Sequence, residues 1–245
     1  MKETNKWQYK GLNMNLSDIK NVDYQEKQEL LAIIDESQKT ELKEIFENGF
    51  TNNYERYKKY LYESNLFMFK DLEFNIKESV NCLIFGAFIA SITNTNLILE
   101  RAIKLALIQF EVGELTDYNN DEIIKKYIEA DKKFSGKNIE SNIQTCLKYK
   151  ILNSEEAQEL REYKLKFRDG FSHFTPRNIL KDENNLVHTE LDSSNLGMDK
   201  HFRMPTFQSA IVRQFAKNNS EKHLVYVLEI INHLQYKLLE KFRKI

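Results

Sequence analysis

The sequence predicts an all-α protein, a bundle of helices within a single domain that covers residues 1–245. Apolar residues recur at intervals of three and four in most segments, which is the period of an amphipathic helix. Only 7 Gly and 2 Pro are present, so the tight turns that a chain of many short strands requires are scarce. No succession of strand-like segments stands out. Together these observations argue against an all-β fold.

The composition limits the classes of function. Charged residues make up 30% of the chain and hydrophobic residues 41%, which is typical of a folded soluble protein. The net charge is −1, so no general basic field attracts nucleic acid, and any contact with RNA or DNA must rely on a local patch. Cys82 and Cys146 lie in apolar or amphipathic surroundings without metal-ligand spacing. We expect both to be buried, reduced thiols.

Neither a secretion signal nor a membrane helix is expected. Met1–Lys20 is polar and lacks an apolar central run. The most hydrophobic segment, Val80–Ile92, is shorter than the roughly 20 residues that a membrane helix needs, and Asn81 and Gly86 interrupt it. We therefore expect a buried core helix there, a cytoplasmic location and no membrane partner.

The first part of the chain reads as a helical extension, residues 1–74. We expect an irregular arm over residues 1–24. Three helices should follow it: Gln25–Ser37, Thr40–Gly49 with Thr40 as N-cap, and Asn52–Phe69, which is rich in Tyr and Lys. The basic residues of the third helix favour a solvated face over an anion site.

The middle of the chain predicts the centre of the bundle. Two long helices, Asp71–Ile92 and Asn96–Glu111, should be joined near Asn94–Asn96, with Asn94 or Asn96 as N-cap. The second is apolar nearly all round, which is typical of a central helix. Its Glu100 and Lys104 are spaced for a local ion pair at the rim of the bundle, or for a supporting role near an active site.

Further amphipathic segments complete the bundle. Asn153 is a predicted N-cap that opens a helix running to about Gly170 or Phe174, and Ser220 is another that opens the final helix. The connection 177–204, with His188 and His201, is long and polar, which is typical of a functional or mobile loop. The other predicted helices are Asp121–Phe134, Asn138–Tyr149, Pro205–Asn218 and Glu221–Ile245.

The stretch Leu160–Pro176 holds the most chemically suggestive residues. Gly170 and Pro176 should weaken and end the helix here. One face is aromatic and predicts core: Leu160, Tyr163, Phe167, Phe171 and Phe174. Two polar stripes flank it: Glu162, Lys166, Asp169 and His173 form one, and Arg161, Leu165, Arg168 and Ser172 form the other. A cation, a carboxylate and an imidazole thus gather beside an aromatic core.

The spacing Arg168-x4-His173, with the polar Asp169 directly after the arginine, resembles the signature of the HEPN family of helical domains. The run Leu-Glu-Arg-Ala-Ile-Lys-Leu at 99–105 is similar to the family's central bundle helix. The resemblance covers residues 75–245 and implies a bundle of the HEPN type with extra N-terminal helices. Many members are metal-independent ribonucleases, which implies that Arg168 and His173 are catalytic and that Asp169 and Ser172 support them.

The residue types fit that chemistry. RNA is cut when its 2′-hydroxyl attacks the adjacent phosphate and leaves a cyclic phosphate. Histidine, with an ordinary pKa of about 6.5, suits the proton transfers. Arginine, with its planar fork and permanent charge, suits the phosphate. No metal or cofactor is required.

The positions of Arg168 and His173 around the helix axis bear on whether one chain can form the site alone. On a continuous helix Arg168 and His173 would lie about 140° apart around the axis, so one chain brings them together poorly. The resemblance implies a homodimer with a composite site that acts on RNA. It also implies a toxin or anti-phage defence role, with an antitoxin or regulatory protein as partner.

Other interpretations stay open. Arg168 and Asp169 fit a plain salt bridge, His173 fits a charge at a helix C-terminus, and Ser172 fits a small polar residue. The chain as a whole fits a non-catalytic helical module that binds RNA, nucleotide or a protein partner, or a structural or regulatory protein. No Gly-rich phosphate loop, His-Glu-x-x-His or Cys-x-x-Cys pattern is present, which argues against nucleotide-loop and zinc chemistry.

Overall fold

The computed structural model confirms the predicted all-α fold class: apart from one short hairpin, the regular elements that it describes are helices. It describes residues 6–9, 12–15, 24–62, 65–113, 119–172, 179 and 205–243. The chain forms two compact units, Met1–Thr51 and Asn52–Ile245. The boundary at 74/75 between an N-terminal extension and a HEPN-like core stays a prediction.

The first unit holds a short hairpin where we expected an irregular arm. Strands β1 (Lys6–Tyr9) and β2 (Leu12–Asn15) pair antiparallel, with Lys6 opposite Asn15 and Tyr9 opposite Leu12. Trp7 and Tyr9 in the first strand are aromatic residues, which favour strands. The expectation overlooked this pair because four-residue strands give too short an alternation to be recognised.

Helix α2 (Tyr24–Tyr57) is one helix of 34 residues, so the prediction of three separate segments over this region is wrong. The hydroxyl of Thr40, the predicted cap, donates to the carbonyl oxygen of Glu36 at 2.9 Å within the helix. The helix therefore continues through Thr40, and the hydroxyl that we expected to cap a new helix bonds to the preceding turn. A 3-10 helix, η1 (Lys58–Leu61), follows α2.

Two packed helices, α3 (Glu73–Ile84) and α4 (Phe88–Val112), follow η2 (Lys70–Leu72). The break between them lies at Gly86, where φ is +74°, and not at Asn94–Asn96 as predicted. Glycine adopts this left-handed conformation without steric cost. The polar residues that suggested a break lie inside α4, and Thr95 is buried there against the hydroxyl of Ser79.

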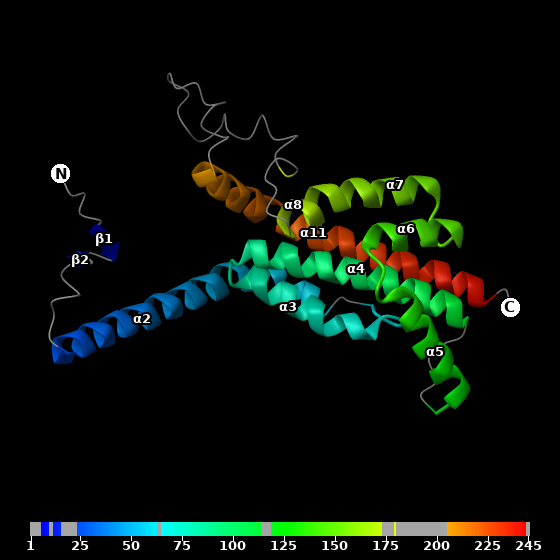
Figure 1. The fold of residues 1–245 in the computed structure, drawn as a ribbon, viewed down its shortest axis with the longest axis horizontal. Helices are drawn as coiled ribbons and strands as arrows, with labels where there is room; N and C mark the ends of the chain where they lie inside the picture. Colours follow the sequence, from blue (N-terminus) through cyan, green and yellow to red (C-terminus); the bar gives the residue numbers. More distant parts are fainter. Residues whose placement is uncertain are drawn as a thin grey trace, which may run out of the picture. The chain divides into compact units, whose positions relative to one another are not determined.

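Helix α4 is central to the second unit, as its nearly uniform apolar character predicted. It packs against α3 and against three later helices, α5 (Asp121–Phe134), α6 (Ile139–Lys148) and α11 (Pro205–Phe242) (Figure 1). The largest core cluster includes Ile103 and Leu107, which are fully buried. Every element of the candidate site described below contacts α4 or lies next to an element that does.

Helices α5 (Asp121–Phe134) and α6 (Ile139–Lys148) follow the predicted bounds closely, whereas α7 (Ser154–Tyr163) begins as predicted but ends before Gly170, where a helix of different type continues it. Asn153 caps α7 as predicted and forms a capping box with Glu156. By contrast, α11 (Pro205–Phe242) is one helix and not two. Ser220 does not cap a helix, because it lies fully buried in the middle of α11.

Two sequence predictions about burial can be compared with the structure. Cys146 is buried, which raises the pKa of its thiol to about 12, whereas Cys82 is only half-buried. Val80–Ile92 spans the end of α3, the turn at Gly86 and the start of α4, so it is not one core helix. Among the described residues, no helix combines the length and the apolar character needed to cross a membrane.

Candidate functional site

The helix that carries the candidate residues changes geometry along its length. After α7 the chain enters a π-helix, η3 (Lys164–Asp169), and continues as α8 (Gly170–Ser172). A π turn contains one residue more than an α turn. The residues beyond it are therefore rotated by about 100° relative to an unbroken α-helix.

The aromatic face predicted from the sequence packs inward. Leu160 and Phe171 are buried, while Tyr163 and Phe167 are half-buried and pack against the core. The rings of Tyr163 and Phe167 stack with centroids 4.6 Å apart. Phe174, the last predicted member of this face, lies outside the described residues.

Of the two predicted helix ends, Gly170 and Phe174, the structure excludes the first, because Gly170 lies within the helix. It is buried, and a Cβ added here would lie 2.6 Å from Cγ1 of Ile179. Ile179 is itself fully buried. The glycine is thus needed for close packing, and its cost in helix propensity is offset by this contact.

Arg168 and Asp169 lie side by side on the outer face of the π-helix. Nη1 of Arg168 is 2.9 Å from Oδ1 of Asp169, and Nη2 lies 3.9 Å from Oε2 of Glu100 on α4. Nζ of Lys164 lies 3.3 Å from Oδ2 of Asp169. Both side chains of the first pair are about three-quarters buried or more, with exposed fractions of 28% and 20%.

These contacts fix the charge state of Asp169. Burial alone would raise the pKa of its carboxyl group, but the hydrogen bonds from Arg168 and Lys164 outweigh burial and hold that pKa below its ordinary value. Asp169 is therefore a carboxylate at neutral pH. It holds charge and orients its neighbours, and it has no proton to donate.

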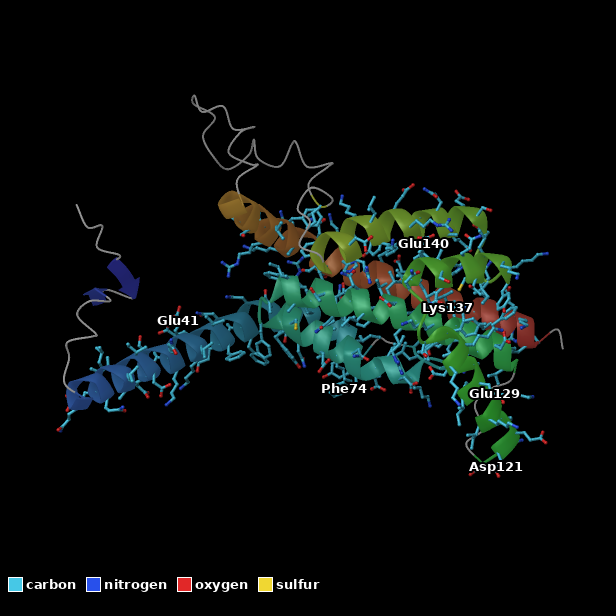
Figure 2. The ribbon with its side chains drawn as sticks, in the orientation of Figure 1. Glu41, Phe74, Asp121, Glu129, Lys137 and Glu140 are labelled. Carbon is cyan, nitrogen blue, oxygen red and sulfur yellow. The ribbon has the colours of Figure 1, made fainter. Side chains whose placement is uncertain are left out.

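The pairs extend into a larger group, here called the ionic cluster. Nε of Arg161 lies 2.7 Å from Glu140 of α6, which Figure 2 labels between the α6 and α7 ribbons. The predicted pair of Glu100 with Lys104 is confirmed at 3.4 Å. The ionic cluster comprises four cations, Lys104, Arg161, Lys164 and Arg168, and three carboxylates, Glu100, Glu140 and Asp169.

The π-helix brings residues from both predicted stripes, and Lys164 from outside them, into one ionic cluster. Lys164 and Asp169 are five residues apart and would point in different directions on an α-helix, yet they are in contact. Arg161 and Arg168 join the same ionic cluster. Leu165, assigned to a stripe with the arginines, is instead 46% exposed.

The remaining predicted site residues are not tested by the structure. The backbone of Ser172 ends α8, but its side chain lies outside the described residues. So do His173, His188, His201 and, apart from Ile179, the connection 177–204. The pairing of Arg168 with His173 stays a prediction.

Two residues that the sequence analysis did not assign to the site lie directly beneath it. Nδ2 of Asn96, on α4, donates to the carbonyl oxygen of Phe167 at 3.2 Å. Oδ1 of Asn96 lies 3.0 Å from Nε2 of His223 on α11. The His223 ring stacks on the Phe167 ring, with centroids 4.5 Å apart and an interplanar angle of 8°. We had taken Asn96 for an N-cap.

Burial controls the charge of His223. The side chain is 1% exposed, and burial lowers the pKa of His223 to about 3, although a backbone hydrogen bond with Ile92 offsets part of this shift. The ring is therefore neutral at physiological pH. A histidine on the apolar face of α11, spaced three from Ser220 and four from Val227, was the available signal in the sequence.

Comparison of the chain with protein-family models, with curated proteins and with solved structures finds no match. The function must therefore be argued from the residues themselves. Over the part of the chain that the structure describes, no three His, Cys, Asp or Glu side chains gather closely enough to hold a metal ion.

Proposed function

We propose that the chain is a metal-independent endoribonuclease of the HEPN type. One observation carries the proposal: Arg168 and Lys164 together hold the carboxylate of Asp169, on the helix that leads directly to His173. Two cations arranged around one carboxylate offer the donors that a phosphate oxygen requires. Arg168 keeps 28% of its side chain exposed, so a substrate phosphate has access to it.

In the proposed reaction the RNA 2′-oxygen forms a bond to phosphorus while the bond from phosphorus to the 5′-oxygen breaks. The products are a cyclic phosphate and a free 5′-hydroxyl. His173 takes the proton from the 2′-hydroxyl, and the partner subunit's His173 gives a proton to the leaving 5′-oxygen. Arg168 neutralises the charge that develops on the phosphate. Asp169 orients Arg168, and Ser172 donates to the phosphate.

The proposal includes a homodimer. The composite site takes Arg168 and His173 from both copies and acts on cytoplasmic RNA. The resemblance to HEPN domains extends the proposal to a toxin or anti-phage defence role, controlled by an antitoxin or regulatory protein.

The experiment is incubation of the purified protein with total RNA in the presence of a chelator. We expect cleavage that persists with chelator and disappears in Arg168→Ala and His173→Ala. Arg213→Ala is the matched control, because Arg213 is an exposed arginine on α11, and it should cleave like wild type. Equal cleavage by wild type and both site variants would exclude the proposed site.

One observation favours a second candidate, a non-catalytic helical module that binds RNA, nucleotide or a protein partner. The guanidinium of Arg168 already has two carboxylate neighbours, Asp169 and Glu100, which reduces its charge toward a new anion. Equal RNA binding by wild type and variants, with cleavage by none of them, would support this candidate.

A further inference from the structure

The π-helix that carries Arg168 and Asp169 is fixed from beneath by a short chain of polar contacts, the first part-buried and the second buried. The chain runs from the Phe167 carbonyl to the amide of Asn96 and on to the imidazole of His223. Its members come from η3, α4 and α11, three elements far apart in the sequence. The Phe167 carbonyl also accepts from the backbone N–H of Gly170, so both of its lone pairs are used.

The direction of each hydrogen bond follows from the first. A carbonyl oxygen only accepts, so the amide nitrogen of Asn96 must face Phe167. The amide oxygen of Asn96 then faces His223 and can also only accept. Nε2 of His223 must therefore carry the ring proton. Every donor and acceptor in this chain is neutral, and the low pKa of His223, about 3, keeps the ring in the same state.

Ring stacking is a second interaction that fixes Phe167 in place. Phe167 is bound through its carbonyl to Asn96 and through its ring to His223. The ring of Tyr163 lies 4.8 Å from that of His223, and its hydroxyl donates to the His223 carbonyl oxygen at 3.3 Å. The residue next to Arg168 is thus held by both its backbone and its side chain.

We infer that Asn96 and His223 are positioning residues, which stabilise the π turn and so place Arg168 and Asp169 on the face of the ionic cluster. Without the π turn, residues beyond it would lie about 100° further round the helix, and Arg168, near its end, would be rotated by part of that angle. Its contact with Asp169 is local, but its approach to Glu100 on α4 depends on this rotation. The assignment of a catalytic purpose to this placement rests on the proposed nuclease function, whereas the structural hold does not.

The test compares Asn96→Leu with Thr95→Val by amide hydrogen exchange across the full chain. Both residues are buried polar groups on α4, but Thr95 hydrogen-bonds Ser79 of α3, whereas Asn96 hydrogen-bonds Phe167 of the π-helix. We expect Asn96→Leu to speed exchange about tenfold in peptides covering 161–172, because the hydrogen bonds of Asn96 to the Phe167 carbonyl and to His223 are both lost. Thr95→Val should leave those peptides as in wild type. Equal acceleration of all peptides, or equal behaviour of the two variants, would overturn the inference.

A second variant guards against a failure of Asn96→Leu to fold. His223→Phe keeps a ring to stack on Phe167 and removes the donor to Asn96. It should give a smaller, several-fold acceleration confined to 161–172, and no local acceleration at all would contradict the inference.

Cleavage supplies the readout that a purely structural role would not move. If wild type cleaves RNA, Asn96→Leu should lower kcat about tenfold with little change in KM, since Arg168 acts on the transition state. An unchanged kcat would refute the inference that Asn96 and His223 position Arg168 for catalysis. Absence of cleavage by wild type refutes the proposed nuclease, while the exchange experiment still decides whether Asn96 and His223 fix the π turn.

Discussion

The π-helix Lys164–Asp169 is held on its two sides by different forces. On the outer side Arg168 and Lys164 pair with Asp169, with side chains that are 20–28% exposed. On the inner side Asn96 and His223 form neutral hydrogen bonds and a ring stack in a buried setting. Partly exposed ion pairs are screened and contribute little, whereas buried neutral bonds are costly to leave unmade. The contacts on the inner side therefore determine the shape of the π turn. The ion pairs on the outer side remain able to exchange partners.

Acid should disrupt the contacts of His223 on the inner side, and the resulting loss of stability is the largest effect we expect. The pKa of His223 is about 3 in the folded chain, against about 6.5 when unfolded. Since the unfolded state binds the proton first, stability is full above pH 6.5 and falls as the pH drops toward 3. The slope is about 1.4 kcal/mol per pH unit, which gives a loss of about 3 to 5 kcal/mol.

Urea unfolding at several pH values measures this slope. His223→Phe should remove it, while Thr95→Val, which changes no titrating group, should retain it. A wild-type protein with the same pH slope as His223→Phe would show that His223 is not buried neutral.

Removal of the stacked ring is the next largest effect. Phe167→Ala should lower the free energy of unfolding by about 2 to 3 kcal/mol, because it deletes the contacts with Tyr163, His223 and Phe215. Leu165→Ala is the control within the same π-helix, since Leu165 is 46% exposed; it should change stability by about 0.5 kcal/mol or less. Similar losses in both variants, measured by chemical unfolding, would mean that the inner side has no special weight.

The outer side should yield the smallest effect. Asp169→Asn removes the ion pairs with Arg168 and Lys164 and should cost about 1 kcal/mol or less. The pKa of Asp169 is lowered on folding, so its contribution is present above the unfolded pKa of about 4 and is lost as the pH falls through the lower folded value. Added salt should shrink the difference from wild type. A loss that exceeds that of Phe167→Ala, or that salt does not change, would reverse the comparison.

The all-α class and the inward face of the site helix were predictable from the sequence. Leu160 and Phe171 are buried as their spacing indicated, because packing of an apolar face dominates where a helix lies. Asn153 also caps α7 as expected, since a cap is a local interaction among neighbouring residues.

Helix boundaries failed where a polar residue suggested a break. Thr40, Asn96 and Ser220 each resembled a cap, but each lies within a longer helix. Thr40 bonds its own helix, and Asn96 bonds residues far along the chain. Such distant partners leave no mark in the local pattern.

A helical period of 3.6 residues also could not predict which residues form the ionic cluster. An extra residue in the turn shifts every later position, so the stripe drawn from Arg161 through Leu165 to Arg168 was only partly right. Asn96 and His223 meet across 127 residues of sequence, which single-chain patterns cannot connect.

The contact between Lys164 and Asp169 has a consequence for how such segments arise and are recognised. If any one residue of Lys164–Asp169 were removed, the segment from α7 to α8 would return to a regular α-helix. The side chains after the deletion would then rotate away from their present neighbours. A single-codon insertion or deletion here therefore acts as a rotation of the downstream side chains, with no change in their identity. Opposite charges five apart, just before a buried glycine, are the trace that such an insertion leaves in the amino-acid order.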